Sequence, residues 1–451
     1  MLIFIIHFPK NQNKQYEETK MTYQSIKEAM AQGEGEVSIR GWVYRERGSK
    51  KLQFIVLRDS SAIIQCVIER DVIGDEQFDI AGKLQIEASM KITGTIKKDE
   101  RAPSGYEIAV KEFTVVGESD QFPIGKDQSQ EFLLDKRHLS LRSRRLTAIM
   151  KIRSSYVQAR DEFYKQQGFF RFDTPILQPS QSEGGSTVFE VKYYQDKTYL
   201  AQTWQLYGEA GIFALEKIYD MGPTFRAEKS NTSRHLSEFW MAEMEAAWMQ
   251  LPEVTAFAKE ELKYCVKKCA EERAEDFEFL EQDPQALIAM CEKDWPSIKY
   301  RDAVAMIKEK DGIDVPFGKD LRTEEERAIM QHFDTPCIVT HYPVVAMGFY
   351  KPRDPEFPDE ALCFDMLAPG IGTEIVGGSE RSLDVKDMSD RLAAEGEDPA
   401  DYDWYFDLRK FGSVPHSGYG VGVERVIAWI CGLDSIKDAI PFPRTPTRFK
   451  P

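Results

Sequence analysis

The stretch between Phe225 and Trp240 concentrates charge in a way that suits a phosphate ligand. Apolar strand-forming residues flank it on both sides, so a hairpin is predicted with its charged residues in and near the loop. Charged groups in such a setting cost free energy unless a ligand or a partner meets them. The planar guanidinium of arginine makes two parallel hydrogen bonds to phosphate, which makes Arg226 and Arg234 the candidate ligands.

A second motif, Gly418 to Arg425, leads into an apolar helix near the end of the chain. It does not match a dinucleotide-binding fingerprint, because Val423 stands where the third glycine belongs, and no Walker-type Gly-Lys-Ser/Thr run occurs. The plainer interpretation is a structural helix that packs closely through small residues. Arg425 favours a functional one, because it is a charge in the first turn of an otherwise apolar helix. We expect no strand between residues 418 and 433.

Two carboxylates, Asp365 and Glu374, precede Arg381 in a glycine-containing strand region. Glu374 and Arg381 are an odd number of residues apart, which places them on opposite faces of a regular strand. Gly377 and Gly378 permit a bulge that re-aims the chain. Paired carboxylates beside a triphosphate suit Mg²⁺, which takes oxygen ligands and keeps several waters. The plainer alternative is a surface ion pair.

Residues 36–118 predict a five-stranded barrel, because five short segments rich in β-branched residues alternate with turn residues. The nucleic-acid-binding OB-fold is one such barrel. Cations near an aromatic side chain and an amide are typical of a reader of single-stranded RNA. The candidates are Arg45, Arg47, Lys50, Lys51, Arg58, Phe54 and Gln65. The alternative is that Phe54 belongs to the barrel core and that the barrel binds nothing.

The bulk composition bounds the class of protein. The 451 residues are enough for two or three domains, and a net charge of −16 argues against a general nucleic-acid coat protein while leaving room for a local basic face. The seven cysteines lack CxxC spacing, and Cys265 and Cys269 have no further zinc ligands nearby. This predicts free thiols in a reducing compartment, the cytoplasm. No apolar stretch reaches the length of a membrane span, so no membrane partner is expected.

The chain is predicted to divide into an extension, a barrel domain and a larger second domain. The first eight residues are apolar but lack a basic leader, so they are not read as a signal peptide. Our hypothesis is that Met21 is the true start and that residues 1–20 are a disordered or spurious extension. The predicted parts are the barrel (21–118), a linker rich in Asp, Gln and Ser (119–140), and the second domain (141–451), with a solvated, largely helical insertion at about 252–335.

The run from Phe225 to Trp240 resembles motif 2 of the class II aminoacyl-tRNA synthetases. Residues 168–175, after a long predicted helix, are similar to motif 1, and Gly420-x-Gly422-x-x-Arg425 is similar to motif 3. With a barrel in front, this order indicates subclass IIb, the aspartyl, asparaginyl and lysyl enzymes. The resemblance runs from about residue 36 to Pro451. It implies an α+β fold, with an N-terminal OB-fold barrel followed by a catalytic domain whose antiparallel sheet is flanked by helices, and a homodimer formed through motif 1.

The resemblance implies ATP as a substrate and Mg²⁺ as a cofactor that binds with it. Arg226 would hold the α-phosphate, and Arg234 and Arg425 the β- and γ-phosphates, so that Arg226 and Arg425 are the catalytic pair. The further ATP contacts that it implies are Glu228, His235, Phe239 and Glu374, and the metal ligands are Asp365 and Glu374. In the barrel, Phe54 would stack on an anticodon base and Gln65 would read the central uridine, with Arg45 beside them.

The resemblance also places an amino-acid site. Glu183 would meet the α-ammonium from a Glu-Gly-Gly loop, Gln205 would line the pocket floor, and Arg381 would hold the side-chain oxygen. Glu243 stands where aspartyl enzymes usually carry aspartate, and its carboxylate accepts hydrogen bonds from an NH₂ group while repelling a substrate carboxylate. This and two flanking segments, 415–418 and 440–448, favour L-asparagine and tRNA(Asn) over aspartate. Gly208-Glu209 departs from the commoner pair of larger residues.

Three alternatives stay open on the sequence. One is an aspartyl enzyme, either specific or able to charge both tRNAs, and another is an asparagine synthetase on this fold, which would lack the barrel. The third is a non-catalytic tRNA-binding paralogue, against which the presence of Arg226, Glu374 and Arg425 argues.

Overall fold

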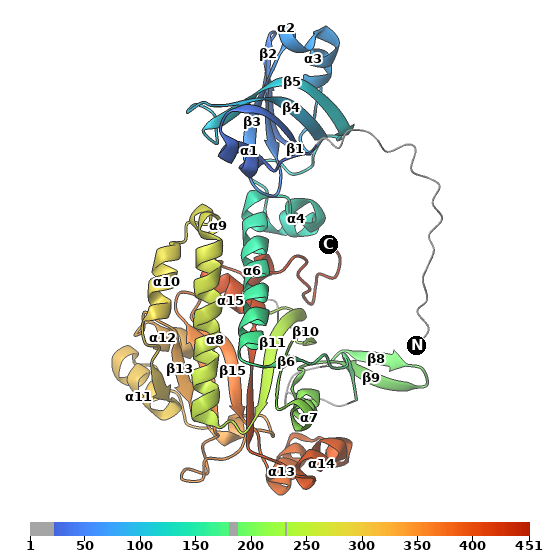
Figure 1. Cartoon of the computed structure of the whole chain (residues 1–451). Coiled ribbons are helices and arrows are strands. Elements are labelled where there is room, and N and C mark those ends of the chain that lie inside the picture. Colours follow the sequence, from blue (N-terminus) through green and yellow to red (C-terminus); the bar gives the residue numbers. More distant parts are fainter. Residues whose placement is uncertain (1–21, 180–187, 231) are drawn as a thin grey trace, which may run out of the picture. The chain divides into compact units, whose positions relative to one another are not determined.

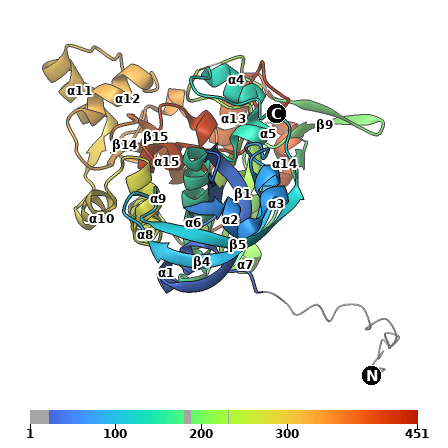
Figure 2. The same cartoon turned by 90° about the horizontal axis from the view of Figure 1, so that it is seen from above.

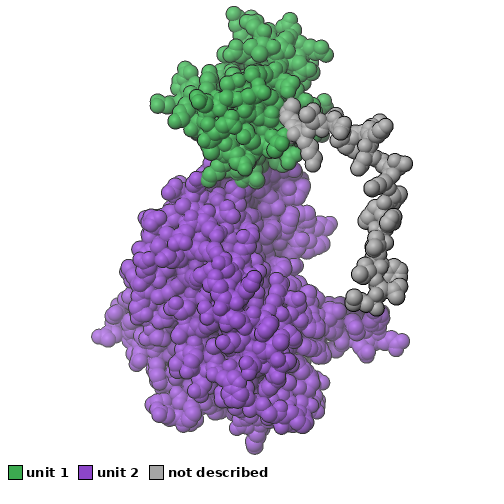
Figure 3. Space-filling model, in the orientation of Figure 1, with its two compact units in different colours: residues 1–128 green, residues 129–451 purple. Residues whose placement is uncertain are grey.

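The computed structural model of the chain describes residues 22–179, 188–230 and 232–451 (Figure 1 and, from above, Figure 2). The predicted extension, residues 1–20, lies outside the described residues, and so does the loop that holds Glu183. The chain divides into two compact units, Met1–Gln128 and Ser129–Pro451, which are described one at a time (Figure 3).

Unit 1 is a closed five-stranded barrel with the strand order β1-β2-β3-β5-β4, which confirms the predicted fold of this region. Its core is filled by alternate side chains, such as Ile55 and Leu57 on β2 and Cys66 on β3. Because successive side chains point to opposite faces of a strand, Phe54 and Gln65 belong to the outer surface. The elements are α1 (Ile26–Gln32), β1 (Gly35–Gly48), β2 (Leu52–Arg58), β3 (Ile63–Glu69), α2 (Arg70–Ile73), α3 (Asp75–Ala81), β4 (Ser89–Lys98) and β5 (Tyr106–Gly117).

Unit 2 is built around an eight-stranded sheet with the order β12-β13-β14-β15-β16-β11-β10-β6. The neighbours from β13 to β10 pair antiparallel, whereas β12 and β6 add parallel edges, so the predicted antiparallel sheet is mixed at its margins. Its strands are β6 (Phe170–Arg171), β10 (Lys217–Phe225), β11 (Glu238–Ala247), β12 (Ser297–Lys299), β13 (Cys337–Thr340), β14 (Cys363–Ala368), β15 (Thr373–Glu380) and β16 (His416–Gly422). A separate three-stranded sheet holds β7 (Leu177–Gln178), β8 (Glu190–Tyr193) and β9 (Asp196–Leu200).

Helices flank the sheet, and those near β12 and β13 gather at one end of it (Figure 2). The helices are α4 (Gln130–Asp135), α5 (Arg137–Ser140), α6 (Arg144–Gln166), α7 (Gln205–Leu215), α8 (Leu251–Glu272), α9 (Ala274–Phe279), α10 (Pro284–Glu292), α11 (Tyr300–Asp311), α12 (Thr323–Met330), α13 (Val385–Glu395), α14 (Asp403–Lys410) and α15 (Val423–Ile430). Single 3₁₀ turns lie at Val344–Ala346, Pro399–Tyr402 and Ile436–Asp438.

The two-residue period of the central strands sorts their side chains by chemistry. On β11, Ala242, Met244 and Ala246 pack with α6, α8 and α15 in the largest apolar core (Figure 1). Glu243 and Glu245 alternate with them and therefore point to the opposite face. That face of the sheet carries the charged groups described below.

Helix α8 was predicted to belong to a solvated insertion, and this prediction is wrong. Its apolar side packs on α6 and on β15 and β16, and it includes the buried Cys265 and Cys269. Glu261 of α8 is fully buried and accepts hydrogen bonds from Arg160 at 2.8 Å and from Tyr164 at 2.6 Å. The many charged residues of α8 favoured a solvated helix. The burial of Glu261 could not be predicted, because its partners Arg160 and Tyr164 lie on a distant segment, α6.

The segment predicted as a linker contains two helices in its second half. Both α4 and α5 belong to unit 2, and Arg137 of α5 is almost fully buried. Its guanidinium donates to the carbonyl oxygens of Lys437, Ile440 and Pro441 at 2.8–2.9 Å, and to Asp438 at 3.1 Å. These contacts join the start of unit 2 to its last residues.

Residues 416–422 form a central strand, β16, contrary to the expectation of no strand in this region. Glycine is a poor strand former because it has no side chain to pack. Here its small size is what the sheet requires. A Cβ on Gly418 would lie 2.2 Å from the Glu245 carboxylate, and one on Gly420 would lie 2.5 Å from the Met241 side chain. Alternate glycines on β16 therefore make space for the long side chains of β11.

The described helices include none that is both long and apolar enough to cross a membrane. All seven cysteines are buried free thiols, as the sequence predicted for a chain without zinc-ligand spacing. Burial raises the pKa of the Cys269 thiol to about 12 and that of Cys291 to about 11, so both are protonated at neutral pH.

Gly418→Ala should destabilise unit 2, because the new methyl group would also lie 2.3 Å from the backbone oxygen of Met244. Overpacking of this kind costs roughly 1–3 kcal/mol of unfolding free energy. Urea unfolding measures the loss. Gly125→Ala is the control, since its Cβ would meet only a side-chain atom at 3.7 Å. Equal stability of the two variants would contradict this account of β16.

Candidate active site

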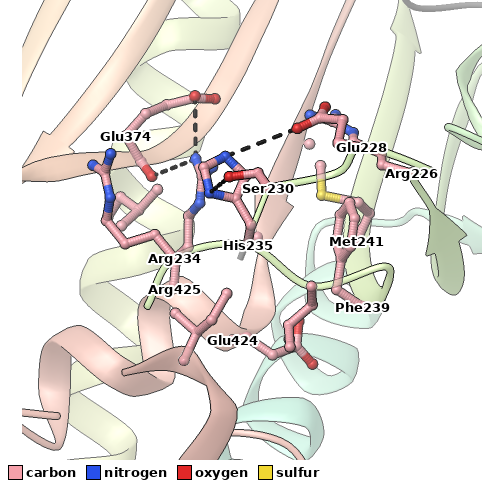
Figure 4. A pocket seen from close by; sticks show the side chains of 15 residues that line it. Arg226, Glu228, Ser230, Arg234, His235, Phe239, Met241, Glu374, Glu424 and Arg425 are labelled. Carbon is pink, nitrogen blue, oxygen red and sulfur yellow. Dashed lines mark hydrogen bonds and ion pairs between the residues drawn. The ribbon is translucent and has the colours of Figure 1, made fainter. Parts of the chain in front are cut away.

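The loop between β10 and β11 closes a pocket together with β15 and the start of α15, which we call the hairpin pocket (Figure 4). The predicted hairpin is confirmed, with Phe225 opposite Glu238 in its register. The residues that line the pocket are Arg226, Glu228, Ser230, Arg234, His235, Leu236, Phe239, Met241, Glu374, Ile375, Gly420, Gly422, Glu424, Arg425 and Ile436. All seven side chains assigned to ATP from the sequence are among them, although they come from three separate segments of the chain.

Arg226 lines this pocket, and one of its N–H donors has no acceptor among the described residues. Its guanidinium carbon lies 5.4 Å from the centre of the Phe239 ring. Its Nε is buried, and within the described residues it has no hydrogen-bond partner. A buried donor without an acceptor is costly, so this atom indicates where a ligand oxygen belongs.

The other two arginines are oriented by neighbours on β15. Arg425 Nη1 donates to the backbone oxygen of Glu374 at 2.9 Å and to its carboxylate at 3.2 Å. Arg234 Nη1 donates to the Thr373 hydroxyl at 3.2 Å and lies 3.6 Å from Glu326. Both guanidiniums are therefore held beside the first residues of β15 in one pocket, and each can bind a phosphate group.

His235 adds a neutral ring to the pocket. Its Nδ1 lies 2.6 Å from the Thr232 hydroxyl, and its Nε2 lies 3.9 Å from Glu228. Partial burial lowers the pKa of His235, and Glu228 only partly opposes that effect. The ring is therefore uncharged at neutral pH, which suits a contact with a flat base more than one with phosphate.

A second cavity adjoins the first and lies over the charged face of the sheet; we call it the sheet pocket. Gln205, Glu243, Asp365 and Arg381, four of the predicted site residues, line it. Its full lining is Gln202, Thr203, Gln205, Arg226, Met241, Glu243, Asp320, Val345, Ala346, Met347, Gly348, Tyr350, Lys351, Asp365, Glu374, Gly377, Gly378, Arg381, Glu395, Tyr419 and Gly420. Arg226, Met241, Glu374 and Gly420 line both cavities, so a group held by Arg226 can be reached from either side.

A bulge in β15 brings the two predicted metal ligands together. Leu367 pairs with Glu374 and Met366 with Val376, so Ile375 is the extra residue. The bulge lies before Gly377 and not at the glycines, but it re-aims Glu374 as expected. The point where a Cβ on Gly377 would sit is 2.8 Å from Glu374 Oε1 and 3.5 Å from Asp365 Oδ1.

These carboxylates repel one another, and Arg425 Nη1, 3.2 Å from Glu374, balances only part of their charge. Burial and the neighbouring Glu374 raise the pKa of Asp365 well above its ordinary value. The same two causes raise the pKa of Glu326 to about 7. Among the described residues, no three His, Cys, Asp or Glu side chains are grouped so as to hold a metal by themselves. A Mg²⁺ ion bound by two carboxylates, phosphate oxygens and water fits this arrangement.

Glu243 and Arg381 are held rigidly at the buried end of the sheet pocket. Glu243 accepts the backbone N–H of Trp204 at 2.8 Å and the Thr203 hydroxyl. Arg381 donates from Nε to both oxygens of Glu245, at 3.1 and 3.2 Å, and from Nη1 to the Ser379 hydroxyl at 2.8 Å. Each side chain therefore has a fixed direction before any ligand arrives.

One wall of the sheet pocket is an irregular loop fastened by a single arginine. Arg391 of α13 donates to the carbonyl oxygens of Val344, Met347, Gly348 and Lys351, at 2.6–3.3 Å. Burial lowers its pKa, yet an arginine remains charged at neutral pH. Four backbone acceptors that would otherwise need water or regular structure are satisfied in this way.

In the barrel of unit 1, the predicted nucleic-acid-reading residues point away from the barrel core, although Gln65 keeps only 5% of its surface exposed. Phe54 is half-buried beneath the Arg47 guanidinium, 4.9 Å from its ring centre, and it is not among the residues of the barrel core, which disfavours the alternative that it is a core residue. Gln65 accepts from Arg47 at 3.5 Å and donates to Glu107 at 3.1 Å, which fixes its amide. Arg45 pairs with Val56 on the same outer face.

Sequence reasoning missed the roles of several acids near the sites, namely the buried Glu107, Glu209 and Glu245, the partly buried Glu326, and Asp320 in the lining of the sheet pocket. Glu245 could have been predicted as a site residue, because it lies two residues after Glu243 in an apolar run and therefore on the same face of a strand. The others meet their partners only across elements far apart in the sequence, and no local pattern marks such residues.

The chain is similar to known proteins over nearly all of its length. Residues 129–446 match the family described as tRNA synthetases class II (D, K and N), and residues 37–116 match the OB-fold nucleic acid binding domain. The asparagine–tRNA ligase of Thermoplasma acidophilum is 44% identical over 92% of this chain and 96% of its own. That of Lactobacillus johnsonii is 42% identical over 95% and 99%.

Solved structures give the same result. Asparaginyl-tRNA synthetase from Pyrococcus horikoshii, complexed with asparaginyl-adenylate, has a TM-score of 0.91 and 41% identity, covering 96% of this chain and 100% of that one. Aspartyl-tRNA synthetase from Entamoeba histolytica has a TM-score of 0.83 but only 25% identity, covering 98% and 96%. The fold is shared by both, and the sequence stands nearer to the first.

Asp365→Asn should stabilise the chain when divalent cations are absent. The folded chain raises the pKa of Asp365, so its ionisation costs stability progressively as the pH rises above about 4. The variant should therefore gain roughly 1–3 kcal/mol over the parent at pH 8, and little at pH 4. Urea unfolding in chelator at both pH values tests this, with the exposed Asp434→Asn as the control. A loss of stability at pH 8 would show that Asp365 has a compensating partner.

Proposed function

The chain belongs to the class II tRNA synthetases of the D, K and N group, and we propose that it joins L-asparagine to tRNA(Asn) through asparaginyl-adenylate, releasing AMP and pyrophosphate. The observation that carries this proposal is the position of Arg226. It lines both the hairpin pocket and the sheet pocket, and its buried Nε has no partner among the described residues. This is where the reacting carboxylate and the α-phosphate have to meet.

The first reaction step needs no nucleophile from the protein. The α-carboxylate of asparagine attacks the α-phosphorus of ATP, and the bond to pyrophosphate breaks. Catalysis then consists of holding two ligands in line and stabilising the charge that develops on the phosphate. Arg226 acts on the α-phosphate, while Arg234 and Arg425 hold the β- and γ-phosphates.

The adenine has a site of its own in the hairpin pocket. We assign it to the space between Phe239 and Arg425, where a flat base can stack on the ring and beneath the guanidinium. Glu228 and the neutral His235 flank this space.

Asp365 and Glu374 would hold Mg²⁺ beside the phosphates. When bound, the ion neutralises charge on the leaving pyrophosphate. The convergence of the two carboxylates near Gly377 and the raised pKa of Asp365 support this assignment. Glu374 lines both pockets and also receives Arg425, so it connects the metal site to the phosphate site.

Asparagine is preferred to aspartate because of the charge that faces its side chain. Arg381 is suited to either substrate oxygen, so the choice depends on Glu243. Its carboxylate can accept from the amide NH₂, whereas an unpaired substrate carboxylate would face it at a cost of several kcal/mol. Gln205 lines the same pocket, and Glu183, outside the described residues, is assigned to the α-ammonium.

In the second step, the 3′-hydroxyl of the terminal adenosine takes the aminoacyl group. Among the described residues we find no evident base for its proton, so we assign that role to a phosphate oxygen of the adenylate. The barrel would select the tRNA, with Phe54 stacking on an anticodon base and the fixed amide of Gln65 reading the central uridine beside Arg45.

Two further assignments complete the proposal. We expect a homodimer formed through residues 168–175, where Phe170 leaves 55% of its surface exposed on an edge strand. We expect a cytoplasmic enzyme, since all seven cysteines are free thiols.

Asparagine-dependent ATP–pyrophosphate exchange by the purified chain tests the function, with aspartate and lysine as comparison substrates. Exchange with asparagine is expected. Arg226→Ala should lower its rate by roughly 10²–10³, the usual loss for one preorganised donor to a transition state. Arg144→Ala, on the first turn of α6 and outside both pockets, is the matched control. Near-normal exchange by Arg226→Ala would refute its role, and exchange with aspartate alone would refute the assigned substrate.

Phe54→Ala should impair the use of tRNA while sparing adenylate formation. Loss of one base-stacking contact costs about 1–3 kcal/mol, which is roughly 5- to 150-fold in kcat/KM for tRNA. Aminoacylation and pyrophosphate exchange should be measured on the same preparation, with Phe54→Tyr as a control that keeps the ring. Equal losses in both assays would indicate misfolding and not a tRNA contact.

A further inference from the structure

Beneath Arg381 lies a buried polar cluster centred on Glu209 of α7. Glu209 is fully buried, and its nearer oxygen lies 3.7 Å from Arg381 Nε. It is absent from the linings of the hairpin and sheet pockets, so nothing places it in contact with a substrate. Its position directly behind Arg381 makes its charge part of the surroundings that a substrate side chain would meet.

Helix α14 and β16 supply the partners of Glu209. The Tyr405 hydroxyl lies 2.7 and 2.8 Å from its two oxygens, and Arg409 donates to the same carboxylate. His416 Nε2 lies 3.1 Å away, and Gln205 Nε2 donates to it at 2.9 Å. A fully buried carboxylate with this many donors is held ionised, and the Arg409 guanidinium is foremost among the groups that lower its pKa.

The cluster contains more carboxylates than guanidiniums. Three carboxylates, Glu209, Glu243 and Glu245, share a buried region with the guanidiniums of Arg381 and Arg409. Burial, with the neighbouring Glu209 and Glu243, raises the pKa of Glu245 to about 8 although Arg381 opposes the shift. A further carboxylate brought in by a substrate would meet this charge, whereas an amide would not.

We propose that Glu209 is a positioning and specificity-determining residue, whose charge sets the electrostatic potential at Arg381 so that a neutral amide side chain is accepted and a carboxylate is rejected. Glu243 faces the substrate, and Glu209 acts from behind through Arg381. Arg409 limits this effect, because its guanidinium pairs with Glu209 and offsets part of the negative charge. The inference rests on the proposed asparagine-activating function and adds a second determinant to it.

The test compares kcat/KM for aspartate with that for asparagine in pyrophosphate exchange by the full chain. Glu209→Gln keeps the shape of the side chain and removes its charge, so the aspartate-to-asparagine ratio should rise roughly 10- to 30-fold. This is the effect of one unit charge at about 8 Å and an effective dielectric constant of about 20. The KM for ATP should stay within about 2-fold, since the hairpin pocket is unaffected.

Two further variants separate charge from packing. In Glu209→Gln/Arg409→Met both charges of the pair are removed, so the ratio should return towards that of the parent. Glu261→Gln is the matched control, because Glu261 is also fully buried and paired with an arginine, but on α8 in the apolar core. It should lower stability without changing the ratio.

The outcomes are distinct. An unchanged ratio in Glu209→Gln, or the same change in Glu261→Gln, would overturn the inference and leave Glu209 a structural residue. If Glu209→Gln fails to fold, Arg409→Met is the deciding variant. It removes the positive charge that offsets Glu209, so the inhibition constant of aspartate should rise relative to the KM for asparagine. No change in that ratio would overturn the inference. Absence of asparagine-dependent exchange by the parent chain would instead refute the proposed function itself.

Discussion

The alternation of side chains along three central strands is the constraint on which the rest of this structure depends. One face of β11, β15 and β16 is largely apolar, because α6, α8 and α15 bury it, and the site carboxylates Glu243, Glu245 and Glu374 lie on the other face. Long acidic side chains on β11 fit there only because β16 contributes glycines opposite them. The substrate-binding acids of β11 therefore require the glycines of β16 for steric reasons.

Charge on that face is arranged for ligands and not for the stability of the empty chain. Asp365 and Glu374 oppose each other, and Arg226 keeps a buried donor without a protein partner in the described part of the chain. These are local costs that ATP and its metal would relieve, since they supply the missing acceptors and counter-charge. Arg381 and Glu243, in contrast, are each oriented by several protein partners, which suits groups that must point in a fixed direction.

What could be predicted from the sequence was what is encoded locally. The barrel strands and the hairpin follow from spacing within a short window, and the nucleotide-pocket residues follow from the resemblance of short motifs to those of the family. The strand β16 was not predicted, because a glycine-rich segment forms a strand only when side chains of the neighbouring strand fill the space beside it. Glu209 escaped for a related reason, since its partners on α14 and β16 are about two hundred residues away in the chain. The position of the β15 bulge depends on the register with β14, which no single segment specifies.

The arginine that fastens the loop at residues 344–351 has a consequence for how this site can vary. Because Arg391 donates to four backbone carbonyls of that loop, the wall of the sheet pocket keeps its form with a single 3₁₀ turn, Val344–Ala346, as its regular structure. Side chains along the loop, such as the exposed Val345, are then free to diverge while the backbone path is kept. The backbone geometry of the wall therefore depends on one side chain, Arg391, which lies some forty residues later in the sequence.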